Sequence, residues 1–229
     1  MTVVLLHSIL GQRQAVRAMG AALAARGSDV IVADLYGDGR EFDDSAEAAA
    51  YAERIGERTL LARARAAAAR AAEPVVYAGF SAGAGIAERL AVGDRRARGL
   101  VLMHGALPVE ELGVARWPRR LPVQTHFADG DPYRDPARFA AFTAAVRSSG
   151  ARLTEYDYPG SGHLFGDHGL PDEYDAISAR RMLDRVARFV AGMAASPRSG
   201  VRAVGAQYQP PLACHCAHAP HGVPYRDAM

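Results

Sequence analysis

The sequence predicts an α/β domain with a mostly parallel central sheet and helices on both faces of that sheet. Apolar runs rich in β-branched residues alternate with Ala- and Arg-rich runs of helical periodicity along most of the chain. The apolar runs lack regular polar alternation, which is typical of parallel strands buried on both sides. Because crossovers between parallel strands are right-handed, the carboxyl ends of the strands should meet at one edge, where we expect the functional site.

The predicted elements follow one another in a regular order. The expected strands are TVVLLH, DVIVADLY, PVVYAGF, RGLVLMHG, PVQTHFAD and RLTEYDYPG. One long helical stretch is expected from Ser45 to Ala72, with the Ser45 hydroxyl accepting from a free amide of its first turn. Gly27 and Gly150 follow other helical runs, where a residue in the left-handed conformation would end each helix.

Length and composition predict one domain followed by a tail. The chain has 229 residues, of which 49% are hydrophobic, enough for one sizeable core over residues 1–193. Residues 194–229 are rich in Pro, Gly and Ala without periodicity, and we expect this tail to be poorly ordered. Its run CHCAHAPH contains soft metal donors, but their spacing fits no familiar zinc site. We therefore expect no metal and no other cofactor.

Charge and residue usage exclude several classes of function. The net charge is only +2, so no nucleic-acid surface is expected. The chain contains no lysine, which excludes a Walker-type phosphate loop and Schiff-base chemistry. The only cysteines are Cys214 and Cys216, and the first apolar run is too short for a signal peptide or a membrane span. We expect a cytoplasmic monomer or small homo-oligomer that acts on a small molecule, with no membrane partner.

The stretch VVYAGFSAGAGIAERL, residues 75–90, contains the pattern GxSxG around Ser81. It follows an apolar strand and begins a helix, which is the setting of a nucleophile elbow. Gly79 and Gly83 would let the strand and helix approach closely, so that the Ser81 hydroxyl projects above the sheet. A dinucleotide loop fits less well, because GAGIAE has only two of the three fingerprint glycines. A purely structural glycine-rich helix start is the other alternative.

A serine nucleophile requires a base and a carboxylate, and candidates for both follow later strands. Asp131 lies in HFADGDPY and His163 lies in YPGSGHLF, each just after an apolar strand. The chain order Ser, Asp, His is that of the α/β-hydrolase arrangement. Asp129 is an alternative acid and His168 an alternative base. The glycines around His163 favour it, because a base must reach the serine from a loop.

Five separated motifs resemble the dienelactone hydrolase family, whose members are small α/β-hydrolases that act on lactones and esters. The motifs are VVLLHSILGQ, VIVADLYGDGR, YAGFSAGAG, LPVQTHFADGDPY and YPGSGHLF, between about residues 3 and 190. The resemblance implies an α/β-hydrolase fold and a Ser81–His163–Asp131 triad. It also implies an oxyanion hole formed by the backbone amides of Ile9 and Ala82.

The resemblance has departures and leaves alternatives. The best-known members of the family carry cysteine at the position of Ser81 and glutamate at that of Ser8. We expect a serine hydrolase that cleaves a small carboxylic ester or lactone through an acyl-serine intermediate. A catalytically silent scaffold that binds a small molecule or a protein, and a thioesterase or acyltransferase, are the alternatives. Candidate pocket walls are Tyr36, Trp117 and Phe165, and candidate partners for a substrate carboxylate are Arg54, Arg58 and Arg116.

Overall fold

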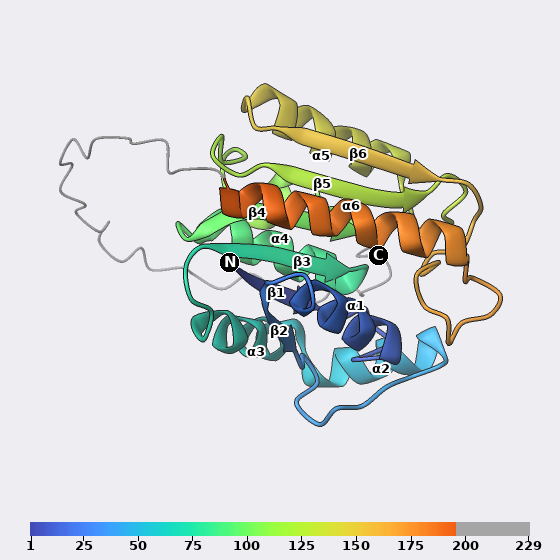
Figure 1. Ribbon diagram of the computed structural model, residues 1–229. Helices are drawn as coiled ribbons and strands as arrows, with labels where there is room; N and C mark the ends of the chain where they lie inside the picture. The colour runs from blue at the N-terminus through green and yellow to red at the C-terminus, as the bar shows by residue number, and fades with distance from the viewer. Residues whose placement is uncertain (196–229) are drawn as a thin grey trace, which may run out of the picture.

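The computed structural model describes residues 1–195 and confirms the α/β fold, with a central sheet of six parallel strands in the order β2-β1-β3-β4-β5-β6 (Figure 1). In chain order the elements are β1 (Thr2–Leu6), α1 (Gln14–Ala24), β2 (Asp29–Ala33), α2 (Ser45–Ile55), α3 (Glu57–Ala69), β3 (Val75–Phe80), α4 (Ala82–Gly93), β4 (Ala97–Met103), the 3-10 helix η1 (Val109–Leu112), β5 (Val123–Ala128), α5 (Pro136–Ser148), β6 (Leu153–Tyr158) and α6 (Ala176–Ala195).

Helices cover both faces of the sheet because successive residues of a strand point to opposite sides. On β1, Val4 and Leu6 belong to the core under α2, α3, α4 and α5, whereas Val3 and Leu5 belong to the core under α1 and α6. Figure 1 shows α1 and α6 crossing in front of the sheet. All four side chains are fully buried, so the strand has no polar face. This explains why the apolar runs of the sequence lack alternation.

The strand order reverses between β1 and β3. From β1 the chain adds β2 on one side and then returns to place β3 on the other side of β1. The segment after β1 leads to α1 on one face, and the segment after β3 leads to α4 on the opposite face. A crevice opens at the carboxyl ends of such neighbouring strands, because their loops diverge. Ile9 lies in the first of these segments and Ser81 in the second.

The long helical stretch predicted from Ser45 to Ala72 is wrong in one respect: it forms two helices. Gly56 separates α2 from α3, with φ 79° and ψ 143°. The residue that caps α2 is Asp44 rather than Ser45. Its Oδ1 accepts from the amide of Glu47 at 2.7 Å, and a carboxylate at this helix end also interacts favourably with the helix dipole.

Other predicted limits can be placed on the structure. Gly27 and Gly150 adopt φ values of 89° and 76°, as expected of residues that follow and end helices. Helix α6 continues to Ala195, two residues beyond the predicted domain limit. The remainder of the predicted tail, with its CHCAHAPH run, lies outside the described residues. Among the helices of residues 1–195, none combines the length and the apolarity that a membrane crossing requires.

Candidate active site

Ser81 lies in a sharp turn between β3 and α4, with φ 50° and ψ −117°. A residue with a side chain rarely adopts this conformation, which costs about 1–3 kcal/mol. The flanking glycines are required by packing. A Cβ on Gly79 would lie 2.2 Å from the carbonyl oxygen of Gly83, and a Cβ on Gly83 would lie 2.1 Å from that of His7. The GxSxG stretch therefore has the strand–turn–helix geometry of a nucleophile elbow.

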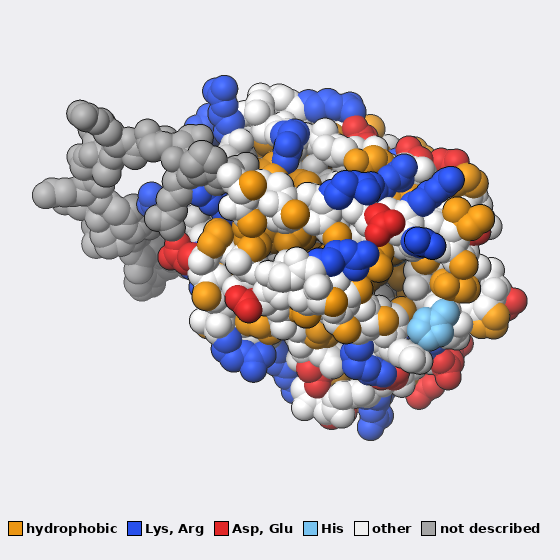
Figure 2. All heavy atoms as spheres, in the orientation of Figure 1, with side chains coloured by type: hydrophobic (Ala, Val, Ile, Leu, Met, Phe, Trp, Pro, Cys, Tyr) orange, Lys and Arg blue, Asp and Glu red, His pale blue; other side chains and the backbone are white. Residues whose placement is uncertain are grey.

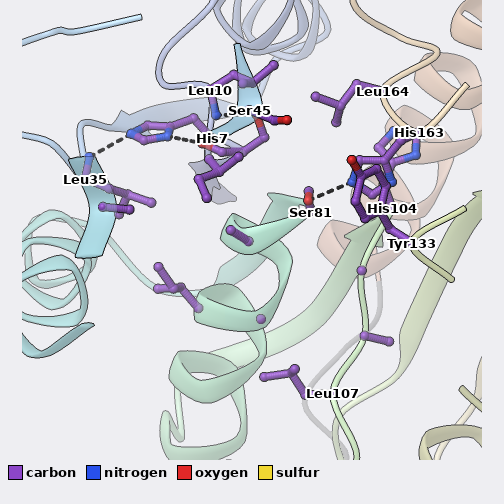
Figure 3. A pocket seen from close by; sticks show the side chains of 18 of the residues that line it. His7, Leu10, Leu35, Ser45, Ser81, His104, Leu107, Tyr133, His163 and Leu164 are labelled. Carbon is purple, nitrogen blue, oxygen red and sulfur yellow. Dashed lines mark hydrogen bonds between the residues drawn. The ribbon is translucent and has the colours of Figure 1, made fainter. Parts of the chain in front are cut away.

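The imidazole of His163 lies between the Ser81 hydroxyl and the Asp131 carboxylate. Its Nε2 is 2.8 Å from Ser81 Oγ, the hydrogen bond drawn in Figure 3. Its Nδ1 is 2.8 Å from Asp131 Oδ2 and 2.9 Å from Oδ1. Because an ionised carboxylate only accepts, Nδ1 carries the hydrogen and Nε2 is left to accept from the serine hydroxyl. The three groups form one continuous hydrogen-bonded line.

The structure brings together the first-choice residues and leaves the alternatives outside. Asp131 follows β5 and its side chain is fully buried, with Oδ1 also accepting from the amide of Tyr133 at 2.9 Å. The alternative acid Asp129 and the alternative base His168 are both exposed. Burial strengthens a hydrogen bond between a carboxylate and an imidazole, so the position of Asp131 suits it to orient His163.

The loop that carries His163 is held in place from two sides. The Glu173 carboxylate accepts from the amide of Leu164. On the other side, the buried Arg13 guanidinium donates to Asp167 at 2.5 Å and to Asp43 at 2.6 Å. Arg13 thus links the loop of His163 to the segment before α2. Sequence reasoning did not single out Arg13, because its partners are far away in the chain.

Two backbone amides beside Ser81 are available to a ligand. Within residues 1–195, the N–H groups of Ile9 and Ala82 donate to no protein acceptor. The amide of Ser81 itself is used, since it donates to the carbonyl of Met103 at 2.7 Å. Ala82 is the first residue of α4, where amides have no partner inside the helix and the helix dipole favours negative charge.

A buried histidine supports the segment that contains Ile9. His7 Nε2 accepts from the amide of Leu35 at 3.0 Å, so Nδ1 carries the hydrogen and donates to the carbonyl of Ser8 at 2.6 Å. Burial lowers the pKa of His7, which keeps the ring in this neutral form. The Tyr36 hydroxyl in turn donates to the carbonyl of Ile9. His7 was not among the predicted site residues, although its place at the end of a buried strand is a usable signal.

A cavity of about 610 Å³ opens above Ser81 and His163. Ile9, Ala82 and Tyr36 line it, together with apolar side chains that the sequence did not identify, including Ile86, Leu107, Phe139 and Leu164. Tyr133 lines it as well, and the centroid of its ring lies 4.6 Å from that of the His163 ring. Figure 3 shows the two side chains on the same side of the cavity.

Two of the three predicted pocket walls are not in the cavity. Trp117 is 1% exposed, its indole N–H donates to the carbonyl of Leu121, and its ring packs edge-on against Phe142 in the core. Phe165 is also buried and lies behind the site, with its ring 4.7 Å from that of His104. These predictions are wrong because an aromatic residue near a site in sequence is equally able to fill the core below it.

The three arginines expected to hold a substrate carboxylate also lie elsewhere. Arg58 and Arg116 are exposed, and Arg54 stacks over the ring of Tyr51 at 5.3 Å. None of the three lines the cavity.

Two buried titratable groups stand next to the site without full hydrogen bonding. His104 follows β4 at φ 64°, its ring lies 5.8 Å from that of His163, and neither ring nitrogen has a protein partner within residues 1–195. Glu88 on α4 accepts from the amide of Leu107 at 2.8 Å through Oε2 only. Burial lowers the pKa of His104 well below its ordinary value and raises the pKa of Glu88 well above its own. Burial thus disfavours the charged form of both side chains.

Comparisons with known proteins agree with the fold described above. Solved structures that resemble the chain include a dienelactone hydrolase-like promiscuous phosphotriesterase from metagenomic libraries, with a TM-score of 0.70 and 22% identity over 84% of this chain and 86% of that one. A Klebsiella pneumoniae protein described as a dienelactone hydrolase has a TM-score of 0.66 and 19% identity over 85% and 87%. The esterase PE8 has a TM-score of 0.58 and 18% identity over 84% and 92%.

A search of curated proteins finds no significant match to the sequence. The sequence model of the dienelactone hydrolase family, in contrast, matches residues 1–193, which include the elbow, the two strand ends that carry Asp131 and His163, and the whole sheet. The chain is therefore a member of the dienelactone hydrolase family, a family of hydrolases.

Proposed function

We propose that the protein is a serine hydrolase that cleaves a small carboxylic ester or lactone through an acyl-serine intermediate. The observation that supports this most directly is the hydrogen-bonded line from Ser81 Oγ through His163 to Asp131, at the floor of a cavity. A scaffold that only binds a ligand would not need a strained serine there, because the φ of Ser81 costs stability.

In the acylation step, Ser81 Oγ attacks the carbonyl carbon of the ester while its proton passes to Nε2 of His163. The carbonyl oxygen becomes an oxyanion in the tetrahedral intermediate. When the intermediate collapses, the bond to the leaving oxygen breaks and Nε2 returns the proton to that oxygen. Asp131 keeps the hydrogen on Nδ1 and stabilises the transient imidazolium.

In the deacylation step, a water molecule takes the place of the alcohol. Nε2 accepts a proton from the water as its oxygen attacks the acyl carbon, and then donates that proton to Ser81 Oγ as the ester bond to the serine breaks. The products are a carboxylic acid and the free serine. In both steps the N–H groups of Ile9 and Ala82 would hold the oxyanion, each contributing about 3 kcal/mol to transition-state stabilisation.

The substrate is expected to be small and mostly apolar near its acyl carbon. The cavity is of a size suited to one small molecule, and Ile86, Leu107 and Leu164 contribute apolar surface to its lining. The family membership favours lactones and esters, and one of the similar structures is an esterase.

The decisive experiment measures ester hydrolysis and covalent labelling on the same preparations. The wild type should hydrolyse p-nitrophenyl butyrate and react with a fluorophosphonate probe, whereas Ser81→Ala should do neither. Asp131→Asn should keep its fold but lose about 10⁴-fold in kcat, because the wrong imidazole tautomer would be favoured. Ser148→Ala, on the exposed end of α5, serves as the control.

Two results would contradict the proposal: labelling that persists in Ser81→Ala, or a well-folded wild type with neither activity nor labelling. Turnover of butyryl thioesters in parallel distinguishes an esterase from a thioesterase, since both would use the same serine.

A further inference from the structure

The charged side chains around the cavity carry information about the substrate. Six of the lining residues are acidic and three are basic, Arg89, Arg134 and Arg138. The formal charge of the lining is thus negative. It stays negative when the ion-pair partners outside the lining, Arg13 and Asp157, are included. On the α1 and α6 side of the molecule, shown in Figure 2, arginines are instead interspersed with carboxylates and apolar side chains.

Each lining arginine is already occupied by protein oxygens. Arg138 makes a two-pronged ion pair with Glu111, with N–O distances of 2.7 and 2.9 Å. Arg89 lies 3.5 Å from Glu57 and also donates to the carbonyl of Glu111. Planar, two-pronged pairing uses the donors that a substrate carboxylate would need.

The third arginine is held in the same way. Arg134 lies 2.6 Å from Asp157 and its guanidinium stacks over the rings of Phe127 and Phe139, at 4.7 and 4.3 Å from their centroids. Stacking fixes the plane of the guanidinium, so it cannot turn toward a ligand without losing both contacts.

Several lining carboxylates, in contrast, have only backbone amides as hydrogen-bond partners within residues 1–195. Asp44 and Asp135 accept from backbone amides at the first turns of α2 and α5, and Glu173 accepts from the amide of Leu164. These hydrogen bonds leave the formal negative charge in place. A substrate carboxylate in the cavity would therefore meet carboxylates without a free guanidinium to pair with.

We propose that the site selects esters or lactones whose acyl and alcohol portions are uncharged or cationic, and that it discriminates against substrates that carry a carboxylate. This proposal rests on the serine ester hydrolase function proposed above and specifies its substrate class. It replaces the expectation that arginines of this chain hold a substrate carboxylate.

Three p-nitrophenyl esters of matched length test the proposal: mono-p-nitrophenyl glutarate, its neutral methyl ester, and p-nitrophenyl 4-(trimethylammonio)butyrate. After subtraction of spontaneous hydrolysis, kcat/KM at low salt should be about tenfold lower for the anionic ester than for the neutral one. The cationic ester should match or exceed the neutral one. At 1 M salt, where the Debye length is about 3 Å, the difference should shrink to about twofold.

Variants that free an arginine should weaken the discrimination against the anionic ester. Glu111→Gln releases Arg138 and removes one carboxylate, so it should raise the ratio of anionic to neutral kcat/KM by about fivefold. Glu57→Gln, at a side chain that is 66% exposed, should raise the ratio in the same direction through Arg89 and provides a second test if Glu111→Gln does not fold. The control is Glu155→Gln, which breaks the ion pair with Arg147 outside the cavity and should leave the ratio unchanged.

The outcomes separate the two proposals. Hydrolysis of all three esters with equal kcat/KM, or a preference for the anionic ester, would overturn the charge selection and leave the serine hydrolase intact. An unchanged ratio in both Glu111→Gln and Glu57→Gln would also overturn it, since the paired arginines would then have no effect. If no ester is hydrolysed and Ser81 is not labelled, both proposals fail.

Discussion

Replacing Ser81 with glycine should leave the protein more stable than replacing it with alanine. The backbone at this position, φ 50° and ψ −117°, is readily adopted by glycine but strained for alanine. Both variants lose the hydroxyl and its 2.8 Å hydrogen bond to His163, so the comparison isolates the backbone. Glycine relieves backbone strain of about 1–3 kcal/mol in the folded state. Its extra freedom in the unfolded chain lowers the free energy of unfolding by about 0.5–1 kcal/mol. The expected difference is about 1 kcal/mol in favour of glycine.

Urea unfolding followed by tryptophan fluorescence measures this difference. Trp117 is the only tryptophan of the chain and is 1% exposed, so its emission should change on unfolding. In a separate thermal unfolding experiment, the same difference of about 1 kcal/mol should shift Tm by about 2–4 °C for a domain of this size. Neither variant should hydrolyse esters.

The matched control for the glycine effect is Ala50→Gly, at an exposed position inside α2. There the backbone is helical, and glycine should lower the free energy of unfolding by about 1 kcal/mol. If Ser81→Gly is as stable as Ser81→Ala, or less stable, the turn stores no strain that a side chain imposes, and this reason for regarding Ser81 as functional is lost.

Three further substitutions test the buried ionisable side chains around the site. Glu88→Gln should become more stable than the wild type as pH rises above about 4.5. Burial raises the pKa of Glu88, so above this pH the unfolded wild-type chain releases a proton that the folded chain keeps, and the wild type loses stability. Urea midpoints of both proteins between pH 5 and 8 measure this difference. His104→Phe should lose less stability than the wild type on acidification below about pH 6.5. Burial lowers the pKa of His104, so in the wild type only the unfolded chain takes up a proton at this side chain, which costs up to about 1.4 kcal/mol per pH unit. The slope of the unfolding free energy against pH, compared between the two proteins, measures this. Arg13→Met should lower the free energy of unfolding by about 3–5 kcal/mol, because Asp167 is left buried without its partner; adding Asp167→Asn should recover much of that loss.

Each of these has an outcome that contradicts it. Parallel pH profiles for the wild type and Glu88→Gln would mean that Glu88 is ionised in the folded protein. An unchanged acid slope in His104→Phe would mean that the folded state protonates this ring. Additive effects in the Arg13 and Asp167 double variant would mean that the two side chains are not coupled.

The sequence alone was sufficient to predict the elements that position the site. Strands without polar alternation, separated by helical runs, determine a parallel sheet, and this in turn brings the residues after β3, β5 and β6 to one edge. The glycines at 79 and 83 were predicted to allow close approach, and a Cβ at either would collide with a carbonyl oxygen. These features are local or follow from topology, so they can be read in one dimension.

The walls and charges of the cavity were decided only by the tertiary structure. Whether Trp117 lines a pocket or fills the core depends on Phe142 and Leu121, and whether an arginine is free depends on a carboxylate elsewhere in the chain, as with Arg138 and Glu111. His7 and Arg13 likewise acquire their partners through folding. Periodicity and turn chemistry specify where a strand ends, but the burial and pairing of a side chain depend on neighbours that only packing in three dimensions supplies.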